Sequence, residues 1–453
     1  MAVDPGAPTR HPVAWRDPEF FDEKSLDAEL RRVFDICHGC RRCFSLCDSF
    51  PRLFDLIDGS ETGELDSVAS ADFKSVVDAC TLCDMCFMVT CPYVPPHEWN
   101  LDFPHLMVRY RVVERARAKV GYLARQVTET DRNGRLGCRL SGLANWSTAT
   151  GNSLTRPVME GMAGIDREAY LPAYDSKTLV RQAAVSAPEI DAAAPAHGRK
   201  AVIYATCFGN FNTPSIGLAA RAVLARNGVE TAVVHPRCCG MPQLEEGDLD
   251  RVAEGAKATA AELGAWIDKG YDVIALVPSC ALMLKFEWPL IVPDDPAVER
   301  LAQATFDIAE YIVDIGRKEG LAPGLGPLDG SVTLHIACHA RAQNMGRKAA
   351  DLLALIPDSD VEVVERCSGH GGAWGVRKAN FATAIKTGRP VARQALKAGR
   401  RYLVSECPLA GPHIAQGMER LATDGEEAPA PESALHPIEL LARAYGIDAG
   451  GAR

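Results

Sequence analysis

Long apolar runs and a secretion signal are both missing from this sequence. No stretch reaches the roughly eighteen apolar residues that a membrane-spanning helix needs. The nearest candidate, Val273–Val292, is interrupted by prolines and charges and predicts a buried strand followed by a helix. The N-terminal residues lack the charged and then apolar layout of a secretory signal. We therefore expect a soluble, cytoplasmic protein whose 16 cysteines serve as metal ligands rather than disulfides.

Nucleotide-binding fingerprints are missing as well. No GxGxxG follows a predicted strand, and there is no Walker loop, so we expect no flavin or nicotinamide site in this chain. Positive charge is in deficit, with 49 Lys and Arg against 59 Asp and Glu and a net charge of -10. This balance argues against nucleic acid as a partner. Any chemistry on an organic substrate therefore belongs to another protein.

What the sequence does contain is two runs of four cysteines. They are Cys37-x2-Cys40-x2-Cys43-x3-Cys47 and Cys80-x2-Cys83-x2-Cys86-x4-Cys91. Such runs are typical of ferredoxins that hold two 4Fe–4S cubane clusters, in which the fourth cysteine of a run commonly binds the other cluster. On this rule one cubane takes Cys37, Cys40, Cys43 and Cys91, and the other takes Cys80, Cys83, Cys86 and Cys47.

The two runs depart from the usual ferredoxin pattern in two places. Cys47 is followed by Asp48 instead of proline, and four residues instead of three precede Cys91. These differences affect the expected geometry of the clusters more than the identity of their ligands. Structural zinc and disulfides are the alternatives, but two triplets with two outlying cysteines fit zinc poorly, and disulfides belong in an oxidising compartment.

Two helices are expected around the second run. Glu61–Ala79 predicts a helix that ends at this run, which favours a helical ferredoxin module. His105–Val127 combines apolar residues with many arginines and predicts a basic amphipathic helix. Such a helix can lie on a membrane or a partner, or it can pack on the ferredoxin with its charges in water.

The second half of the chain follows an Ala- and Pro-rich linker, Ala183–Ala196, and contains an internal duplication. Three segments of the first copy resemble three segments of the second in order and spacing. The pairs are Ala201–Cys207 with Val332–Cys338, Val233–Gly240 with Val363–Gly369, and Val273–Cys280 with Tyr402–Cys407. Short β-branched runs alternate with helical segments, so each copy predicts an α/β lobe.

Cysteines stand at the end of each of these predicted strands, where ligands of α/β sheets bind. The first lobe has Cys207, Cys238, Cys239 and Cys280, and we expect a third iron–sulfur cluster there. The second lobe has only Cys338, Cys367 and Cys407, with Ser368 after Cys367. Its site has three readings: a cluster with one iron not bound by cysteine, a zinc site completed by His339, His370 or His413, or an empty pocket. Cys138 stands apart and predicts a buried structural thiol.

Both lobes resemble the cysteine-rich CCG domain, which occurs twice in one of the subunits of heterodisulfide reductases and in the iron–sulfur subunits of glycolate and lactate oxidases. With the connector Asn145–Tyr174 and the ferredoxin runs, the chain is most similar to the iron–sulfur subunit of anaerobic glycerol-3-phosphate dehydrogenases. A complete reductase site has five cysteines, and the resemblance implies an unusual non-cubane cluster there. The segments that carry the likeness are Ala205–Asn212, Cys238–Pro242, Ser279–Pro289 and Gly375–Asn380.

From these observations we expect a multidomain α+β chain, with a helical two-cluster ferredoxin module followed by two duplicated α/β CCG lobes. The expected boundaries are 1–30 for an N-terminal arm, 31–130 for the ferredoxin, 131–198 for connector and linker, 199–322 for the first lobe and 331–447 for the second, degenerate lobe.

We interpret the chain as the electron-transfer subunit of an oxidoreductase complex. The resemblance implies a flavoprotein dehydrogenase subunit as partner, and quinone or another acceptor, with a membrane-associated quinone-reducing component and a peripheral place on the inner face of the membrane. Electrons would pass through the cubanes and the lobe-one cluster. The alternative is a thiol/disulfide oxidoreductase that cleaves a disulfide at a CCG-bound cluster. The shortage of lobe cysteines favours the relay over this alternative and over a scaffold without redox work.

Overall fold

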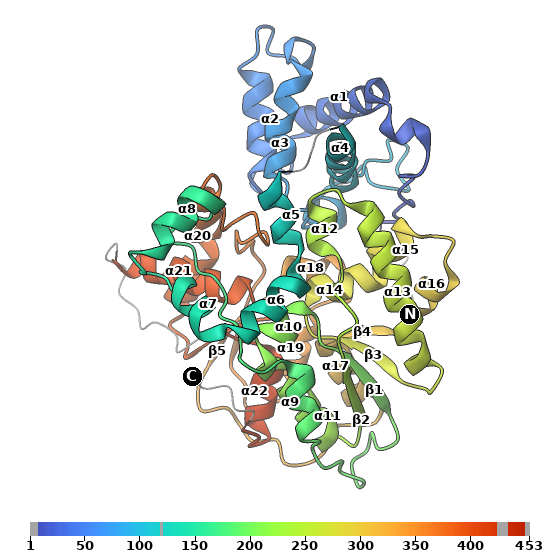
Figure 1. Ribbon diagram of the computed structural model, residues 1–453, viewed down its shortest axis with the longest axis vertical. Coiled ribbons are helices and arrows are strands. Elements are labelled where there is room, and N and C mark those ends of the chain that lie inside the picture. The colour runs from blue at the N-terminus through green and yellow to red at the C-terminus, as the bar shows by residue number, and fades with distance from the viewer. Residues whose placement is uncertain (1–7, 118–120, 424–433, 449–453) are drawn as a thin grey trace.

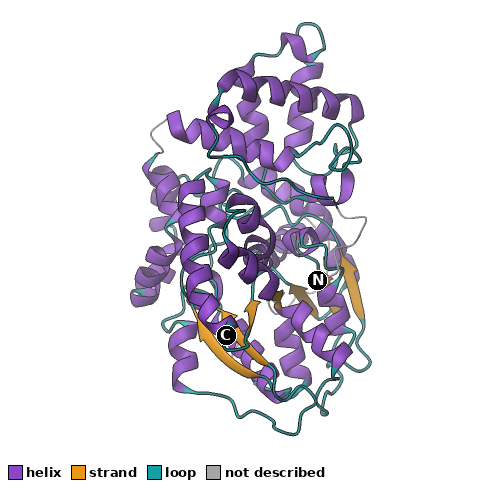
Figure 2. Ribbon diagram, turned by 90° about the vertical axis from the view of Figure 1, so that its right-hand side faces the viewer, coloured by secondary structure: helices purple, strands orange, loops and turns teal. Residues whose placement is uncertain are grey.

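The computed structural model describes residues 8–117, 121–423 and 434–448. Helices that follow the N-terminus gather at one end of the molecule, and two α/β lobes make up the rest (Figure 1). The strands of both lobes lie at the end opposite to the N-terminal helices (Figure 2). The mixed α/β character with two lobes confirms the prediction from the duplicated pattern.

The N-terminal region is entirely helical in its described part. Helix α1 begins where the Asp22 carboxylate accepts a hydrogen bond from the Ser25 N–H (2.7 Å) and ends at Arg41, which has a left-handed backbone. The elements are 3₁₀-helix η1 (Pro18–Phe21), α1 (Glu23–Cys40), α2 (Ser49–Asp58), 3₁₀-helices η2 (Leu65–Ser67) and η3 (Ser70–Asp72), α3 (Phe73–Ala79), π-helix η4 (Cys86–Thr90) and α4 (Phe103–Arg117).

Two helix predictions need adjustment. Of the segment Glu61–Ala79, only α3 is α-helical, because two 3₁₀ turns and Gly63 with positive φ precede it. The predicted helix His105–Val127 begins earlier as α4, and a separate helix covers its end; residues 118–120 lie outside the described part. One side of α4 is buried, and Arg111 and Arg115 bond to lobe one. The packing alternative therefore holds for α4.

A connector of short helices joins the N-terminal region to the lobes. It consists of α5 (Tyr122–Thr128), α6 (Thr130–Arg139), α7 (Ser141–Thr148), α8 (Thr155–Ala163) and α9 (Leu179–Val185). The predicted linker Ala183–Ala196 is mostly non-helical, but the Asp191 N–H donates to the Ala225 carbonyl (3.0 Å), so this part of it is bound to lobe one. The predicted boundaries of these regions stay expectations.

Lobe one is built on a parallel sheet with the order β2-β1-β3-β4. Its strands are buried between helices, as parallel sheets require. The elements are β1 (Lys200–Tyr204), α10 (Cys207–Phe211), α11 (Pro214–Arg226), β2 (Glu230–Val234), α12 (Met241–Glu245), α13 (Leu249–Ile267), β3 (Asp272–Ala275), α14 (Pro278–Leu282), π-helix η5 (Met283–Glu287), α15 (Trp288–Ile291), α16 (Pro296–Ala304), β4 (Thr305–Asp307) and α17 (Ile308–Lys318).

Lobe two repeats this plan with the order β6-β5-β7-β8, again all parallel. The matching order confirms the duplication. Helix α20 has the predicted bounds, and lobe two is shorter in its connections. The elements are β5 (Val332–His335), α18 (Cys338–Ala342), α19 (Lys348–Leu353), β6 (Val361–Val364), α20 (Phe381–Ala398), β7 (Tyr402–Ser405), α21 (Ala410–Thr423), β8 (Ala434–Leu435) and α22 (Pro437–Ala444).

The regions share one hydrophobic core. It runs from the N-terminal helices through lobe one into lobe two, and a smaller cluster fills the space under α20 and α21. The last helix, α22, packs on α11 of lobe one as well as on α19 of lobe two. The two lobes are therefore held in a fixed relation.

The N-terminal arm ties the second cysteine run to lobe one. The Arg10 guanidinium lies 2.9 Å from Asp84, 2.8 Å from Asp102 and 3.0 Å from Glu287, and it covers the Phe87 ring. His105 completes the group by bonding to Glu287 (3.0 Å). Burial opposes the charge on Asp102, but His105 and Arg10 lower the pKa of this carboxyl to about 2.

Replacing Arg10 with methionine is expected to destabilise the protein by about 3–5 kcal/mol, because removing one partner leaves buried charges uncompensated. Urea unfolding of the anaerobically purified protein, followed by circular dichroism, measures the change. The control is Arg16→Met, since the exposed Arg16 only stacks on Trp15. An equal loss in both variants would show that Arg10 acts as an ordinary surface arginine.

Candidate metal centres

The first group of thiols comes from the end of α1, the turn after it and the end of η4. Cys37 and Cys40 lie in the last turn of α1, and Arg41, with φ of 51°, turns the chain so that Cys43 follows on the same side. Burial, and then the neighbouring thiols, raise the pKa of Cys37. The structure brings together Cys37, Cys40, Cys43 and Cys91.

The second group lies deeper. Leu82 and Asp84 have positive φ (49° and 62°), so the loop wraps around its own centre between the three spaced cysteines. Burial, then the thiol of Cys83 and its neighbours, raise the pKa of Cys86. Cys43 of the first group also contributes to this shift, so the two groups are adjacent. The structure brings together Cys47, Cys80, Cys83 and Cys86.

The lobe-one thiols meet at the carboxyl edge of the sheet. Register pairs Tyr204 with both Val234 and Ala275, so the turns after β1, β2 and β3 end side by side. The Sγ atoms of Cys207 and Cys238 are 3.8 Å apart. Gly240 has φ of 88°, a conformation that favours glycine, where the chain turns into α12. The group consists of Cys207, Cys238, Cys239 and Cys280.

Polar contacts from outside the sheet hold this group. The Asp131 carboxylate of α6 accepts from the Cys238 N–H (2.8 Å) and bonds to His235 (2.8 Å). The Trp288 indole N–H donates to the Cys239 carbonyl (3.0 Å). Hydrogen bonds from Cys207 and Cys239 lower the pKa of Cys238, whereas the same contacts raise the pKa of its two partners. One thiolate is thus favoured even before a metal binds.

Lobe two brings Cys338, Cys367 and Cys407 together in the same way. The Gly369 N–H donates to the Cys367 Sγ (3.3 Å). Gly369 has φ of 81°, and an added Cβ would lie 2.1 Å from the Ala384 carbonyl oxygen, so only glycine fits here. Ser368 takes the place of the second cysteine of the pair.

The three histidines near these thiols have different surroundings. The His339 Nε2 bonds to the Leu82 carbonyl (3.1 Å), which belongs to the loop of the second thiol group. His370 and His413 lie edge to face, and burial lowers their pKa values to about 3 and about 4. The buried Nε2 of His413 has no hydrogen-bond partner among the described residues. Its ring is therefore neutral.

The four groups form a series. Cys83 of the second group lies near Cys338 and Cys367 of lobe two, and Cys407 of lobe two lies near Cys280 of lobe one. Hydrogen bonds fix both junctions: Trp374 donates to the Asp78 carbonyl (2.9 Å), and the Gln343 amide of lobe two donates to the Pro278 carbonyl of lobe one (3.4 Å). Lobe two therefore lies between the N-terminal thiols and lobe one.

These groups fit clusters of several irons better than single ions. Within residues 8–117, 121–423 and 434–448, no three His, Cys, Asp or Glu side chains converge on one ion. A cubane holds its four thiolates at separate corners, and N–H groups that point at sulfur, as at Cys367 and Cys91, stabilise the cluster charge. Sixteen thiols include only one outside the groups, Cys138, which is buried as predicted and donates to the Phe211 carbonyl.

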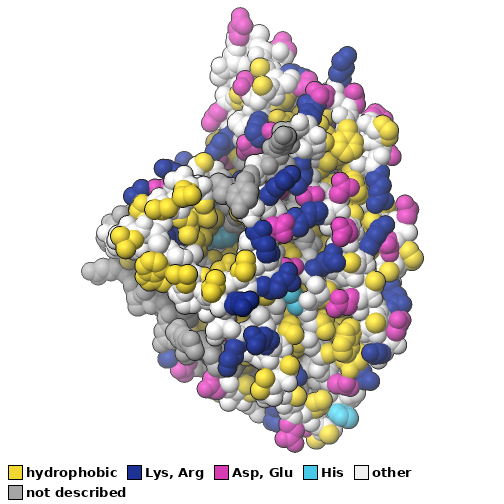
Figure 3. Space-filling model, in the orientation of Figure 1, with side chains coloured by type: hydrophobic (Ala, Val, Ile, Leu, Met, Phe, Trp, Pro, Cys, Tyr) yellow, Lys and Arg dark blue, Asp and Glu magenta, His cyan; other side chains and the backbone are white. Residues whose placement is uncertain are grey.

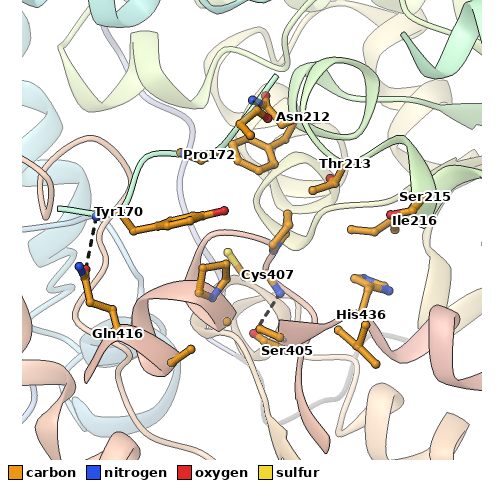
Figure 4. A pocket seen from close by; sticks show the side chains of 18 of the residues that line it. Tyr170, Pro172, Asn212, Thr213, Ser215, Ile216, Ser405, Cys407, Gln416 and His436 are labelled. Atoms are coloured by element: carbon orange, nitrogen blue, oxygen red, sulfur yellow. Dashed lines mark hydrogen bonds between the residues drawn. The ribbon is translucent and has the colours of Figure 1, made fainter. Parts of the chain in front are cut away.

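Two cavities border the lobe thiols. The larger, of about 570 Å³, lies between the lobes and the connector, and the Cys407 side chain faces it (Figure 4). Its lining includes Tyr170, Phe208, Ser215, Gln416 and His436. The smaller, of about 310 Å³, lies at Cys238 and Cys239 and has four arginines in its wall: Arg132, Arg135, Arg237 and Arg251.

Several of these residues could not be found from the sequence. Arg10, Asp131 and Tyr170 stand in segments without a motif, and each meets its thiol group only after the chain has folded back. The likeness of the segment Asn145–Tyr174 to known relatives was the single signal, and it gave no role. His436 follows residues 424–433, which lie outside the described part.

Comparison with known proteins agrees with this arrangement. The CCG model, "Cysteine-rich domain", matches residues 201–285 and 332–411. The anaerobic glycerol-3-phosphate dehydrogenase of Escherichia coli (strain K12) has a subunit, designated C, that is 27% identical over 308 residues, 65% of this chain and 74% of the relative. The fumarate reductase (CoM/CoB) of Methanothermobacter marburgensis has one, designated B, that is 26% identical over 257 residues (55% and 47%). Lactate utilization protein A of Geobacillus thermodenitrificans is 30% identical over 188 residues (39% and 75%).

Two CCG lobes with cysteines at their strand ends define an iron–sulfur protein of the cysteine-rich class. More particularly, the chain belongs to the CCG-domain iron–sulfur family that includes the matched subunit of anaerobic glycerol-3-phosphate dehydrogenase, as its motifs predicted. None of the described helices has the length and apolar character needed to cross a bilayer.

Proposed function

We propose that this chain is the electron-transfer subunit of an oxidoreductase complex, which receives electrons from a flavoprotein dehydrogenase subunit and passes them to quinone or another acceptor. The observation that carries the proposal is the unbroken series of thiol groups from Cys37 to lobe one. Relatives named as subunits of a dehydrogenase and a reductase support a partner of this kind.

The ligand assignment follows the grouping of thiols. We assign one 4Fe–4S cluster to Cys37, Cys40, Cys43 and Cys91, a second to Cys47, Cys80, Cys83 and Cys86, and a third iron–sulfur cluster to Cys207, Cys238, Cys239 and Cys280. Bound clusters would supply one-electron carriers along the series. Cys338, Cys367 and Cys407 are assigned to a fourth metal site with an open ligand position. The chain itself keeps these groups dry and fixes their order.

The acceptor is assigned to the cavity of about 570 Å³ beside Cys407. The cavity has aromatic and proline side chains for a planar ring, and the Tyr170 hydroxyl points into it as a donor to a carbonyl oxygen (Figure 4). Its position at Cys407 places an acceptor at the junction of the two lobes.

Protein purified without oxygen is expected to hold about eight irons in its N-terminal thiol groups, four for each cubane, and further iron in the lobes. Iron and sulfide analysis with electron paramagnetic resonance of the dithionite-reduced chain measures this. Mixing the reduced chain with the soluble quinone menadione should oxidise all signals together. Protein that binds zinc but no iron, or whose signals persist with menadione, would contradict the proposal.

Disulfide reduction is the second candidate, supported by the arginine-lined cavity at Cys238 and Cys239, which suits an anionic disulfide. Cleavage of that bond takes two electrons and two protons and yields two thiols, so the reduced chain would have to supply both electrons. Lobe one has four thiols where a complete reductase site has five, and this favours the relay. Thiol release from oxidised glutathione by the reduced chain would reverse the preference.

A further inference from the structure

Helices α6, α7 and α8 present large hydrophobic side chains to solvent. Figure 3 shows such side chains gathered over α7 and α8, close to a group of Lys and Arg. Each of the seven side chains is more than half exposed, although most hydrophobic residues of this chain are buried. This outer face consists of Leu136, Leu140, Leu143, Trp146, Leu154, Val158 and Met162.

The packing of α6 explains why its leucines point outward. The side that meets the rest of the protein consists of Gly134, Gly137 and Cys138. An added Cβ at Gly134 would lie 2.2 Å from the Phe211 ring, and one at Gly137 would lie 2.6 Å from the Tyr174 ring. The smallest residues thus face the core and the largest face away. The exposed leucines contribute nothing to this packing, so a contiguous apolar surface of this kind indicates a binding face.

The charges around the outer face have one sign. Between Thr130 and Ala163 the exposed charged side chains are Arg132, Arg135 and Arg139. Asp131 is bonded to His235 and Cys238, and Arg156 and Glu160 are buried. Among the described residues no carboxylate forms an ion pair with Arg135 or Arg139 within 4.0 Å. On a chain with a net charge of -10, this local positive edge favours an anionic surface as the binding partner.

We propose that the outer face of α6–α8 docks onto the surface of a bilayer that contains anionic lipids. Short amphipathic helices with Leu, Trp and Met on one side and arginines at the edge are suited to lie in the headgroup region. A protein partner would be expected to bury its contact around a packed centre, whereas this face is spread over three short helices and has no acidic residue to orient a partner.

The position of the face also bears on the acceptor, and this part rests on the proposed function. Tyr170 and Pro172 follow α8 directly and line the cavity beside Cys407. A lipid-soluble acceptor that leaves the bilayer at the outer face would therefore meet the mouth of this cavity first.

Flotation of the full, anaerobically purified chain with vesicles tests the docking. The chain should float with phosphatidylglycerol-containing vesicles and much less with phosphatidylcholine vesicles. The double variant Leu143→Ser/Trp146→Ser should lower the bound fraction about tenfold, because two partly inserted side chains are lost. Arg135→Gln/Arg139→Gln should lower it about tenfold on the anionic vesicles alone. The control Val185→Ser/Ile190→Ser changes exposed hydrophobic residues elsewhere and should bind as the parent does.

Three results would overturn the docking proposal. They are a parent chain that does not float, a Leu143/Trp146 variant that floats like the parent, and a parent that forms dimers which this variant abolishes, since the face would then bind a second copy. Reoxidation of the dithionite-reduced variants by ferricyanide should match the parent. A failure of the electron relay would appear in that reaction and leave flotation unchanged, so the two proposals fail separately.

Discussion

Replacing Cys83 with serine is expected to stop electron transfer between the N-terminal thiols and the lobes. Cys83 belongs to the second thiol group and is also the member closest in effect to Cys338 and Cys367 of lobe two. A serine hydroxyl is a far poorer iron ligand than a thiolate. Even residues around the ligands of metal sites change affinity or activity 10- to 100-fold, so loss of a ligand should slow transfer by about a hundredfold or more.

Rapid-freeze electron paramagnetic resonance after mixing with limiting dithionite measures the effect. The signal assigned to Cys37, Cys40, Cys43 and Cys91 should persist, while signals of the lobes stay oxidised. The matched control is Cys138→Ser, since Cys138 is a buried cysteine outside every group and its contact with the Phe211 carbonyl can be kept by a hydroxyl. Lobe signals that appear at the parent's rate in Cys83→Ser would contradict the order of the series.

Cys91→Ser separates crossed from uncrossed ligands. Cys91 lies with Cys37, Cys40 and Cys43 although it follows the second run in sequence. We expect the signal of that first cluster to change while the signal of the second stays close to that of the parent. Damage confined to the cluster of Cys80, Cys83 and Cys86 would contradict the crossed assignment.

The lobes could be predicted from the sequence because their determinants are local. β-branched runs, turn residues and the repeated order of cysteines gave β1, β2 and β3 and their counterparts β5, β6 and β7. A cysteine that directly follows a strand must lie at the carboxyl edge of a parallel sheet. The grouping of Cys207 with Cys238 therefore needed no knowledge of how the lobes pack.

The order of the thiol groups could not be predicted, because it depends on packing between regions. Chain order places lobe one next to the ferredoxin region, and the expected electron path therefore passed through lobe one alone. In the folded chain, His339 bonds to the loop at Leu82 and Trp374 bonds to Asp78, so lobe two contacts the second thiol group. Neither contact has a sequence signal, since a histidine or tryptophan in a loop more often has a local partner.

Cys338→Ala is expected to slow the reduction of lobe one without removing any N-terminal signal. Cys338 lies close to Cys367 and Cys407 in lobe two and to Cys83 of the second thiol group, at the one place where the series narrows to three thiols. Alanine cannot bind iron, so the site would lose a third of its thiolates. Transfer to the cluster of Cys207, Cys238, Cys239 and Cys280 should fall at least about tenfold.

The same rapid-freeze measurement gives the result, with Cys207→Ala for comparison. Cys207 lies in the last group of the series, so its loss should change the lobe-one signal itself and leave every earlier step at the parent's rate. Iron analysis of Cys338→Ala shows whether the lobe-two site held metal. If lobe one is reduced as fast in Cys338→Ala as in the parent, electrons reach it directly from the second group, through the contact of Arg111 with Glu245 and Cys80, and lobe two is an empty pocket.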